Sequence, residues 1–286
     1  MEKLNYNIIE NLMLDEERAL YNTTDAIIKN CKFDGLKDGE SAIKECKNIY
    51  ITDCYFNLRY PLWHNKKVDI NKSVMTENCR AALWYSSDIK IIDSTLDGIK
   101  LLRECNDIDI SNSKIDSDEF GWKNKNINIV DSKINGKYAF FETNSINIER
   151  VKFSGKYSFQ YTKNVEVVDS ILDTKDAFWH AENITLRNCY VKGEYLGWYA
   201  KNIIFIDCTI EGTQPLCYAD DIKIINCKMI NCDLAFENTN VNAVINGHID
   251  SIKNPLSGKI FVDSVGDIIQ DDQLYGCKGE VIINKK

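Results

Sequence analysis

Apolar residues recur along this chain with a period of nineteen residues. Each repeat begins with two aliphatic residues separated by one polar residue, as in Ile108 and Ile110. This alternation indicates a β-strand, because helices place apolar residues three and four positions apart. The first aliphatic residue falls at Ala26, Ile49 and Val68 with variable steps. It then advances in unbroken steps of nineteen through Ile89, Ile108, Ile127, Ile146, Val165, Ile184, Ile203 and Ile222.

We number the positions of a repeat from this residue, which is position zero. Position four is usually Asn or Asp, position five is Ser or Cys, and position seven is apolar, as in Asn112, Ser113 and Ile115. Position nine is often Gly, as in Gly136. Asn, Asp and Gly adopt left-handed backbone conformations easily, so we expect corners at these positions. A third apolar stretch at positions twelve to sixteen completes a triangular coil of three strands and three corners.

Such coils stack about 4.8 Å apart and form three parallel sheets. Leucine-rich repeats and helical repeats fit this pattern less well, because the first need a leucine ladder and the second need longer units. The sequence therefore predicts an all-β fold, a single-stranded right-handed parallel β-helix (solenoid) of about twelve coils of nineteen residues with capped ends. We expect a single domain over residues 1–286, with an N-terminal cap at 1–25, coils at 26–250 and a C-terminal cap at 251–286.

Composition and charge limit the classes of ligand that the protein can bind and the cellular compartment in which we expect it. The net charge is −8, and no basic stripe is present that would bind nucleic acid or an anionic membrane. No apolar run is long enough to span a bilayer. The N-terminal residues lack the features of a secretory signal, and the eleven cysteines are an odd number, so we expect a cytoplasmic protein with reduced thiols. No phosphate-binding loop or zinc signature occurs, so we expect no cofactor and no metal.

Aromatic residues concentrate in the predicted third strand. We assign positions twelve, fourteen and sixteen to the interior, which places Trp84 and Trp122 inward; a slip of one residue would exchange the two faces. Positions eleven, thirteen and fifteen then face solvent as a long aromatic strip. Such a strip usually marks a contact site, and its rings and hydroxyls suit a polysaccharide. The predicted ligand-binding residues are Tyr85, Tyr138, Phe140, Tyr157, Phe159, Tyr161, Phe178, His180 and Tyr199.

Two acidic residues in the same strip are candidates for catalysis. Position fifteen holds Glu104, Lys123 and Glu142 in consecutive coils. Two coils correspond to about 9–10 Å, near the upper end of the roughly 6.5–9.5 Å that separates the carboxylates of inverting glycosidases. Lys123 between them favours the ionised form of both, which argues against a general acid. A ladder of surface charges is the competing interpretation.

Several phrases of the chain resemble a bacterial family. They are RYPLWHNKK from Arg59, AALWYSSDI from Ala81, DAFWHAENIT from Asp176, GEYLGWYAKN from Gly193 and DSIKNPLSG from Asp250. The family has a domain of unknown function with the pectin-lyase-like right-handed parallel β-helix, and the resemblance covers nearly the entire chain. It implies the fold but no activity or catalytic residue. Some members are labelled hydrogenase, but this sequence lacks any C-x-x-C motif for iron-sulfur or nickel-iron ligation.

Three functions stay open from the sequence. The aromatic strip favours non-catalytic binding of an extended poly- or oligosaccharide. A carbohydrate-active enzyme, either a glycoside hydrolase or a lyase, is the second alternative and would use the same face. A structural or self-associating protein that forms a homodimer through the aromatic strip is the third.

Overall fold

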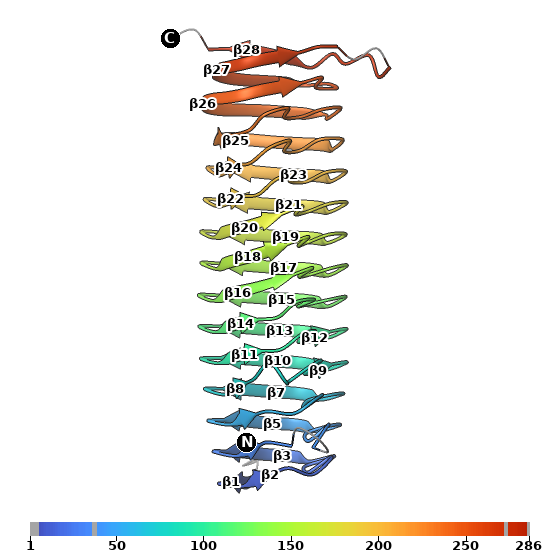
Figure 1. The fold of residues 1–286 in the computed structure, drawn as a ribbon, viewed down its shortest axis with the longest axis vertical. Coiled ribbons are helices and arrows are strands. Elements are labelled where there is room, and N and C mark those ends of the chain that lie inside the picture. The colour runs from blue at the N-terminus through green and yellow to red at the C-terminus, as the bar shows by residue number, and fades with distance from the viewer. Residues whose placement is uncertain (1–5, 36–38, 272–273, 285–286) are drawn as a thin grey trace, which may run out of the picture. The chain divides into compact units, whose positions relative to one another are not determined.

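The computed structural model describes residues 6–35, 39–271 and 274–284. These residues form β-strands and turns, and no helix among them is long and apolar enough to cross a membrane. The chain divides into two compact units, Met1–Thr143 and Asn144–Lys286, which we call the first unit and the second unit. Within each unit the strands of successive coils lie one above another (Figure 1).

The strands of the first unit pair in parallel with the equivalent strands of neighbouring coils. One sheet contains β1 (Asn7–Glu10), β3 (Thr24–Lys29), β5 (Lys47–Thr52), β7 (Lys66–Asn71), β10 (Ser87–Ile92), β13 (Asn106–Ser111) and β15 (Lys125–Val130). A second sheet contains β2 (Met13–Leu14), β4 (Lys32–Phe33), β6 (Tyr55–Phe56), β8 (Val74–Met75), β11 (Thr95–Asp97), β14 (Lys114–Asp116) and β16 (Lys133–Lys137). A short pair on the third side consists of β9 (Leu83–Trp84) and β12 (Leu102–Arg103).

The second unit repeats this arrangement. Its first sheet begins with β17 (Asn144–Glu149), β19 (Lys163–Val168), β21 (Glu182–Arg187) and β23 (Lys201–Ile206). Its second sheet contains β18 (Lys152–Lys156), β20 (Ile171–Lys175), β22 (Tyr190–Lys192) and β24 (Thr209–Glu211). The long strand β25 (Asp220–Ile230) pairs with both β23 and β24, and it is followed by β26 (Val241–Lys253), β27 (Lys259–Ile269) and β28 (Glu280–Ile283).

The register of these pairings confirms the nineteen-residue repeat. In the first unit Ile89 pairs with Ile108, and Ile108 pairs with Ile127. In the second unit Ile184 pairs with Ile203, which pairs with Ile222. All six side chains are at most 1% exposed. The chain is therefore a parallel β-helix with like residues stacked in its interior.

The end segments also form strands that pair with coils. Strand β1 pairs in parallel with β3, so that Asn7 lies opposite Ala26. At the other end β26 pairs with β27, and β27 pairs with β28. The number of turns is about fourteen, close to the predicted twelve, because these segments contribute turns of their own.

The first corner of each coil is closed by Asn and Asp in the left-handed region. Asn188 has a φ of 51° and Asp169, one coil earlier, has a φ of 50°. The side-chain amide of Asn188 donates to the carboxylate of Asp169 over 2.6 Å. Similar bonds connect other pairs of neighbouring coils, so this corner carries a polar ladder at the surface.

A second ladder, which we call the corner ladder, lies inside the same corner and consists of the Ser and Cys side chains at position five. The hydroxyl of Ser113 accepts the backbone N–H of Ser94 over 3.1 Å and donates to the carbonyl of Ser111 over 2.8 Å. Cys208 has the same role, because its sulfur accepts the N–H of Cys189 over 3.4 Å. A buried N–H that has left the sheet needs such a partner, which explains why most coils have Ser or Cys at this position, although Val151 occupies it in one coil.

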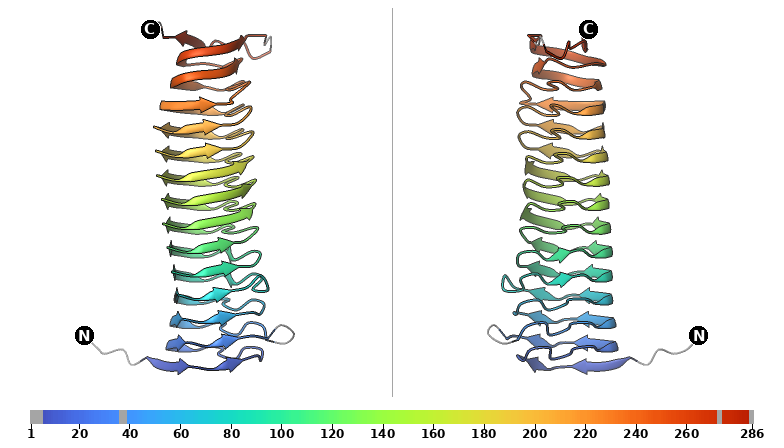
Figure 2. Two further views of the ribbon diagram at one scale, coloured as in Figure 1. Left: turned by 60° about the vertical axis from the view of Figure 1, so that its left-hand side comes forward. Right: turned by 90° about the vertical axis from the view of Figure 1, so that its right-hand side faces the viewer.

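The third side of each coil is mostly a turn and not the predicted strand (Figure 2). Every second residue on this side has a positive φ: the values for Tyr157, Phe159 and Tyr161 are 57°, 58° and 57°. Side chains alternate between two faces only in extended backbone. Here Ser158 and Phe159 both point inward, each 0% exposed. Positions twelve, thirteen and sixteen are therefore interior, and positions fourteen and fifteen face outward.

Replacing Ser113 by Ala should lower the free energy of unfolding by about 1–3 kcal/mol, because it leaves the buried N–H of Ser94 without an acceptor. Ser113→Cys should retain most of the stability, since cysteine fills the equivalent position in Cys208. The midpoint of urea unfolding, followed by circular dichroism, measures both changes. A Ser113→Ala variant as stable as the parent protein would contradict the assigned role of the hydroxyl.

Candidate functional site

Three exposed aromatic residues of the second unit and the half-buried Tyr218 form one column at position fifteen. We call Tyr161, His180, Tyr199 and Tyr218 the aromatic ladder. Neighbouring rings are almost parallel, with centroids 4.9, 5.1 and 5.4 Å apart and interplanar angles of 10°, 9° and 17°. Tyr161 is 47% exposed and Tyr199 is 48% exposed, although Tyr199 has a stacked ring on either side. The ladder therefore presents a continuous strip of ring surface to solvent.

Tryptophans form a second column beside the ladder, at position fourteen. The indoles of Trp179 and Trp198 are stacked, with centroids 5.6 Å apart. Each indole N–H donates to a backbone carbonyl of the next coil: Trp179 to Tyr195 over 2.7 Å, and Trp198 to Gln214 over 2.8 Å. The half-buried tryptophans thus stabilise the fold, because their indole N–H groups hydrogen-bond backbone carbonyls on the turn-rich third side.

The first unit has a shorter version of the same surface. His64 stacks on Tyr85 with ring centroids 5.0 Å apart. Beside them, Trp63 stacks on Trp84 at 5.3 Å, and the guanidinium of Arg103 lies 5.0 Å from the ring of Trp84. After Tyr85, position fifteen is occupied by charged residues, so the stacked rings of this column end after two coils.

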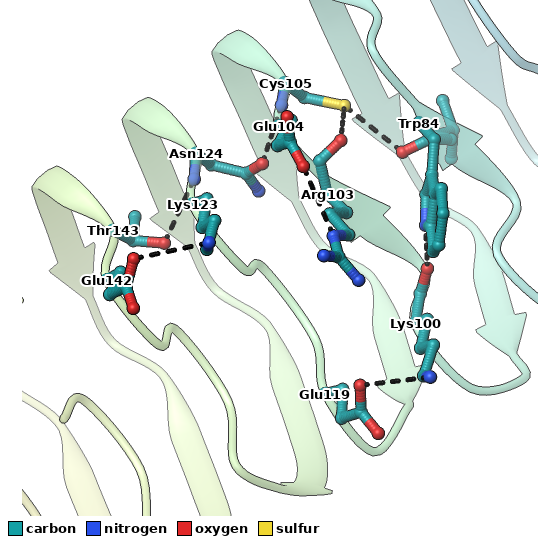
Figure 3. A network of polar contacts seen from close by, with 11 residues as sticks. Trp84, Lys100, Arg103, Glu104, Cys105, Glu119, Lys123, Asn124, Glu142 and Thr143 are labelled. Atoms are coloured by element: carbon teal, nitrogen blue, oxygen red, sulfur yellow. Dashed lines mark hydrogen bonds and ion pairs between the residues drawn. The ribbon is translucent and has the colours of Figure 1, made fainter.

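The two predicted catalytic carboxylates lie among these charged residues (Figure 3). Glu104 lies 3.4 Å from the Nε of Arg103, and Glu142 lies 3.5 Å from the Nζ of Lys123. Their side chains are 41% and 46% exposed. A general acid is usually held protonated by apolar surroundings, and both carboxylates are instead partly exposed and lie beside a cation. The arrangement resembles a surface charge ladder, and the catalytic role stays a prediction.

The structure corrects the predicted orientation of three ligand-binding residues. Phe140, Phe159 and Phe178 were expected at the surface, but each is 0% exposed. They occupy position thirteen, which turns inward because its backbone is left-handed. Within the second unit Phe159 stacks on Phe178 with centroids 4.8 Å apart. These phenylalanines cannot contact a ligand.

The other predicted ligand-binding residues reach the surface. In the first unit Tyr85 is 42% exposed and Tyr138 is 44% exposed. In the second unit Tyr161, His180 and Tyr199 are exposed, and Tyr157 is half-buried. The structure brings Tyr161, His180 and Tyr199 together in the aromatic ladder and adds Tyr218 to them.

The sequence interpretation missed the outward face of the tryptophans. Trp179 and Trp198 were assigned to the interior, yet both are half-exposed. No sequence signal marks this, because only the left-handed backbone of Phe159 and Phe178 explains why each is buried together with the residue before it, Ser158 or Ala177. Strict alternation cannot bury two adjacent residues.

The cysteine column in the second unit is part of the corner ladder. Cys189, Cys208 and Cys227 are buried. The N–H of Cys189 donates to the sulfur of Cys208 over 3.4 Å, and the N–H of Cys208 donates to the sulfur of Cys227 over 3.3 Å. Among the described residues, no group of three or more His, Cys, Asp or Glu side chains is arranged to hold a metal ion.

The sequence matches, over residues 7–283, the family described as "Protein of unknown function (DUF3737)". The chain belongs to this family. No curated protein matches this DUF3737 sequence.

Several solved structures resemble the DUF3737 chain at low identity. PfbA, a surface adhesin of Streptococcus pneumoniae, is 12% identical with a TM-score of 0.40, over 86% of this chain and 77% of that one. The A-module of the mannuronan C-5 epimerase AlgE4 of Azotobacter vinelandii is 11% identical with a TM-score of 0.28, over 97% and 91% of the two chains. At these TM-scores the similarity carries no argument about function.

Replacing Phe159 by Ala should lower the free energy of unfolding by about 3–5 kcal/mol, because the ring is fully buried. Tyr161→Ala, two residues later, should cost only about 0.5–1.5 kcal/mol, since mainly ring stacking is lost. Urea unfolding of the two variants measures the difference. A larger loss for Tyr161→Ala would show that the two side chains face opposite to the directions described.

Proposed function

We propose that this protein binds an extended glycan, without cleaving it, along the aromatic ladder of the second unit. The observation that carries the proposal is the ladder itself, four nearly parallel rings repeated coil by coil, of which three are exposed and Tyr218 is half-buried. Aromatic side chains that converge with a few polar groups are common in ligand sites.

The inclination of the rings supports contact with sugars. Coils are spaced about 4.8 Å apart, whereas carbon atoms in contact approach to about 3.5–4.0 Å. Parallel rings on successive coils must therefore tilt relative to the coil direction in order to touch. Tilted rings overlap only in part, which agrees with the 48% exposure of Tyr199 between its two stacked neighbours. The uncovered part of each ring can contact sugar C–H groups, and the Tyr hydroxyls can bond sugar hydroxyls.

The repeat of the ladder suits a polymeric ligand. Equivalent groups recur in Tyr161, His180, Tyr199 and Tyr218 at nearly constant centroid spacings of 4.9–5.4 Å. A ligand built from similar units can make the same contact several times, and each added contact strengthens binding without a deep pocket. A compact small molecule would use only one or two of these rings.

Hydrolysis is the weaker alternative. Its candidate residues, Glu104 and Glu142, belong to the first unit, and each is partly exposed beside a cation. The glycan that binds best should therefore show no increase in reducing ends during incubation. Release of reducing ends that disappears in Glu142→Gln would favour the enzyme.

Replacing Tyr199 by Ala should weaken glycan binding about tenfold, which corresponds to about 1.4 kcal/mol and to the usual contribution of one aromatic contact. A glycan array finds the ligand, and calorimetry with the best oligosaccharide measures its dissociation constant. Tyr55→Ala is the matched control, because this tyrosine lies on β6 in the second sheet of the first unit.

Three results would each change this proposal. If Tyr199→Ala binds the glycan as tightly as the parent protein, the binding site lies outside the ladder. A protein that binds no glycan, but forms a dimer that Tyr199→Ala disrupts in light scattering, would assign the ladder to self-association. A protein that does neither would leave the ladder with a structural role only.

We also infer that the protein works in a reducing compartment such as the cytoplasm. All eleven cysteines are free, ten of them are buried and Cys277 is partly exposed. Burial raises the pKa of the Cys105 and Cys232 thiols to about 12. Neutral buried thiols are poor nucleophiles and resist oxidation, and the corner ladder uses thiols as hydrogen-bond groups.

A thiol reagent should label about one cysteine per native chain quickly, namely Cys277, and all eleven after denaturation. The measurement is a colorimetric thiol titration of protein purified from cytosol without reductant. Several fast-reacting thiols would contradict the described burial. Fewer than eleven thiols after denaturation would indicate disulfides and contradict the reducing compartment.

A further inference from the structure

A groove of about 440 Å³ crosses the corner between the second sheet and the third side of the second unit. It runs over the ends of β18, β20, β22 and β24, whose labels appear in Figure 1. Its floor contains glycines, and its charged walls contain Lys156, Asp173, Lys175, Lys192, Glu194 and Glu211. The sequence predicted a corner at the glycines, but it marked none of the six charged residues as part of a site.

The floor of the groove is empty of side chains because the coils approach too closely there. A Cβ atom on Gly193 would lie 2.2 Å from the carbonyl oxygen of Thr174, and one on Gly212 would lie 2.2 Å from the carbonyl oxygen of Gly193. Their φ values, 152° and 134°, also lie outside the usual range of other residues. The fold therefore requires glycine at these positions, and the open floor is a consequence of that requirement.

The charges in the groove balance. Three lysines face Asp173, Glu194 and Glu211. Lys175 lies 2.6 Å from Glu194, and Lys192 lies 3.4 Å from Glu211. Ammonium groups only donate hydrogen bonds and carboxylates only accept them. The walls thus offer donors and acceptors side by side with no net charge.

This balance selects the chemical class of ligand. A hydroxyl group both donates and accepts, so a neutral sugar can bond to the lysines and the carboxylates alike. A charged sugar meets both signs of charge in the groove and so gains no net electrostatic attraction. The cost of removing water from its charged groups is then not offset, which favours a neutral ligand.

A chain of ring contacts connects the groove to the aromatic ladder. The Nζ of Lys175 lies 5.3 Å from the ring centroid of Tyr195. The ring of Tyr195 lies 5.4 Å from that of Trp198, which lies 6.2 Å from that of Tyr199. The surface between the charged groove and the exposed ladder is therefore lined by aromatic rings.

From these observations we propose that the groove is the polar part of the glycan site and that it makes the site specific for neutral, hydroxyl-rich oligosaccharides. This inference rests on glycan binding by the ladder. It adds a ligand class, neutral glycans, which excludes polyuronates and amino-sugar polymers. It also adds a second set of contacts, which position the glycan on the ladder.

The test compares three oligosaccharides of equal length by calorimetry: a neutral glucan, a polyuronate and a deacetylated amino-sugar chain. The parent protein should bind the neutral chain best. Thr213→Trp fills the groove beside Gly212 and should weaken that binding about tenfold. Circular dichroism and the urea midpoint show that each variant is folded.

Charge reversal gives the sharper comparison. Asp173→Lys changes the groove from balanced to positive, so it should weaken binding of the neutral glucan and allow the polyuronate to bind in a salt-sensitive manner. Asp116→Lys is the matched control, because Asp116 occupies the same coil position in the first unit. The control should bind like the parent protein.

The outcomes separate this inference from the function on which it rests. If Tyr199→Ala loses glycan binding and Thr213→Trp binds as before, the groove has no role in binding and the ladder alone is the site. A preference of the parent protein for the polyuronate or the amino-sugar chain would overturn the neutral specificity. Absence of binding to any of the three chains would refute both the groove and glycan binding by the ladder.

Discussion

Parallel pairing between coils in a fixed register is the constraint on which the rest of this structure depends. Each strand bonds to the equivalent strand of the next coil, which from Ile89 to Ile222 is nineteen residues away, as between Ile108 and Ile127 or Ile184 and Ile203. Every side chain therefore has its equivalent as a neighbour, about 4.8 Å away. Side chains at equivalent positions must therefore be compatible with one another, whether they are alike or pair as donor and acceptor. Isoleucines stack in the interior, serine and cysteine do so at the corner, and tyrosine and histidine do so at the surface of the second unit.

The same constraint explains how surfaces arise in such a protein. The corner hydroxyls satisfy backbone groups that leave the sheets, and the indoles of Trp179 and Trp198 satisfy carbonyls on the third side. Position fifteen has a left-handed backbone in both units, but its side chains differ. In the second unit they form the aromatic ladder, and in the first unit they are Glu104, Lys123 and Glu142. The groove has a different origin, since it follows from the glycines that the tight second corner requires.

The sequence was sufficient to predict the coil, its register and two of its three sides, because strands of alternating residues leave a direct signal in the periodicity. It was insufficient on the third side. Phe159, Phe178 and Tyr161 have positive φ values, which bulky residues rarely adopt in isolation. Cooperative stacking of coils stabilises this backbone, and a single repeat does not reveal it. For this reason Phe140, Phe159 and Phe178 were placed outside and the tryptophans inside. The groove could not be predicted either, since its walls come from four coils and its depth depends on how closely their backbones approach.

The most direct test of this stacking is the nuclear magnetic resonance spectrum of the His180 ring, which belongs to one of only three histidines. If Tyr161 and Tyr199 lie on its two faces with centroids 4.9 and 5.1 Å away, their ring currents should shift its carbon-bound protons upfield. The protons should also show nuclear Overhauser effects to both tyrosine rings, and Tyr161→Ala or Tyr199→Ala should each reverse part of the shift. A His180 ring with the shifts of an unfolded chain and no contact to either tyrosine would show that equivalent residues are not stacked in register.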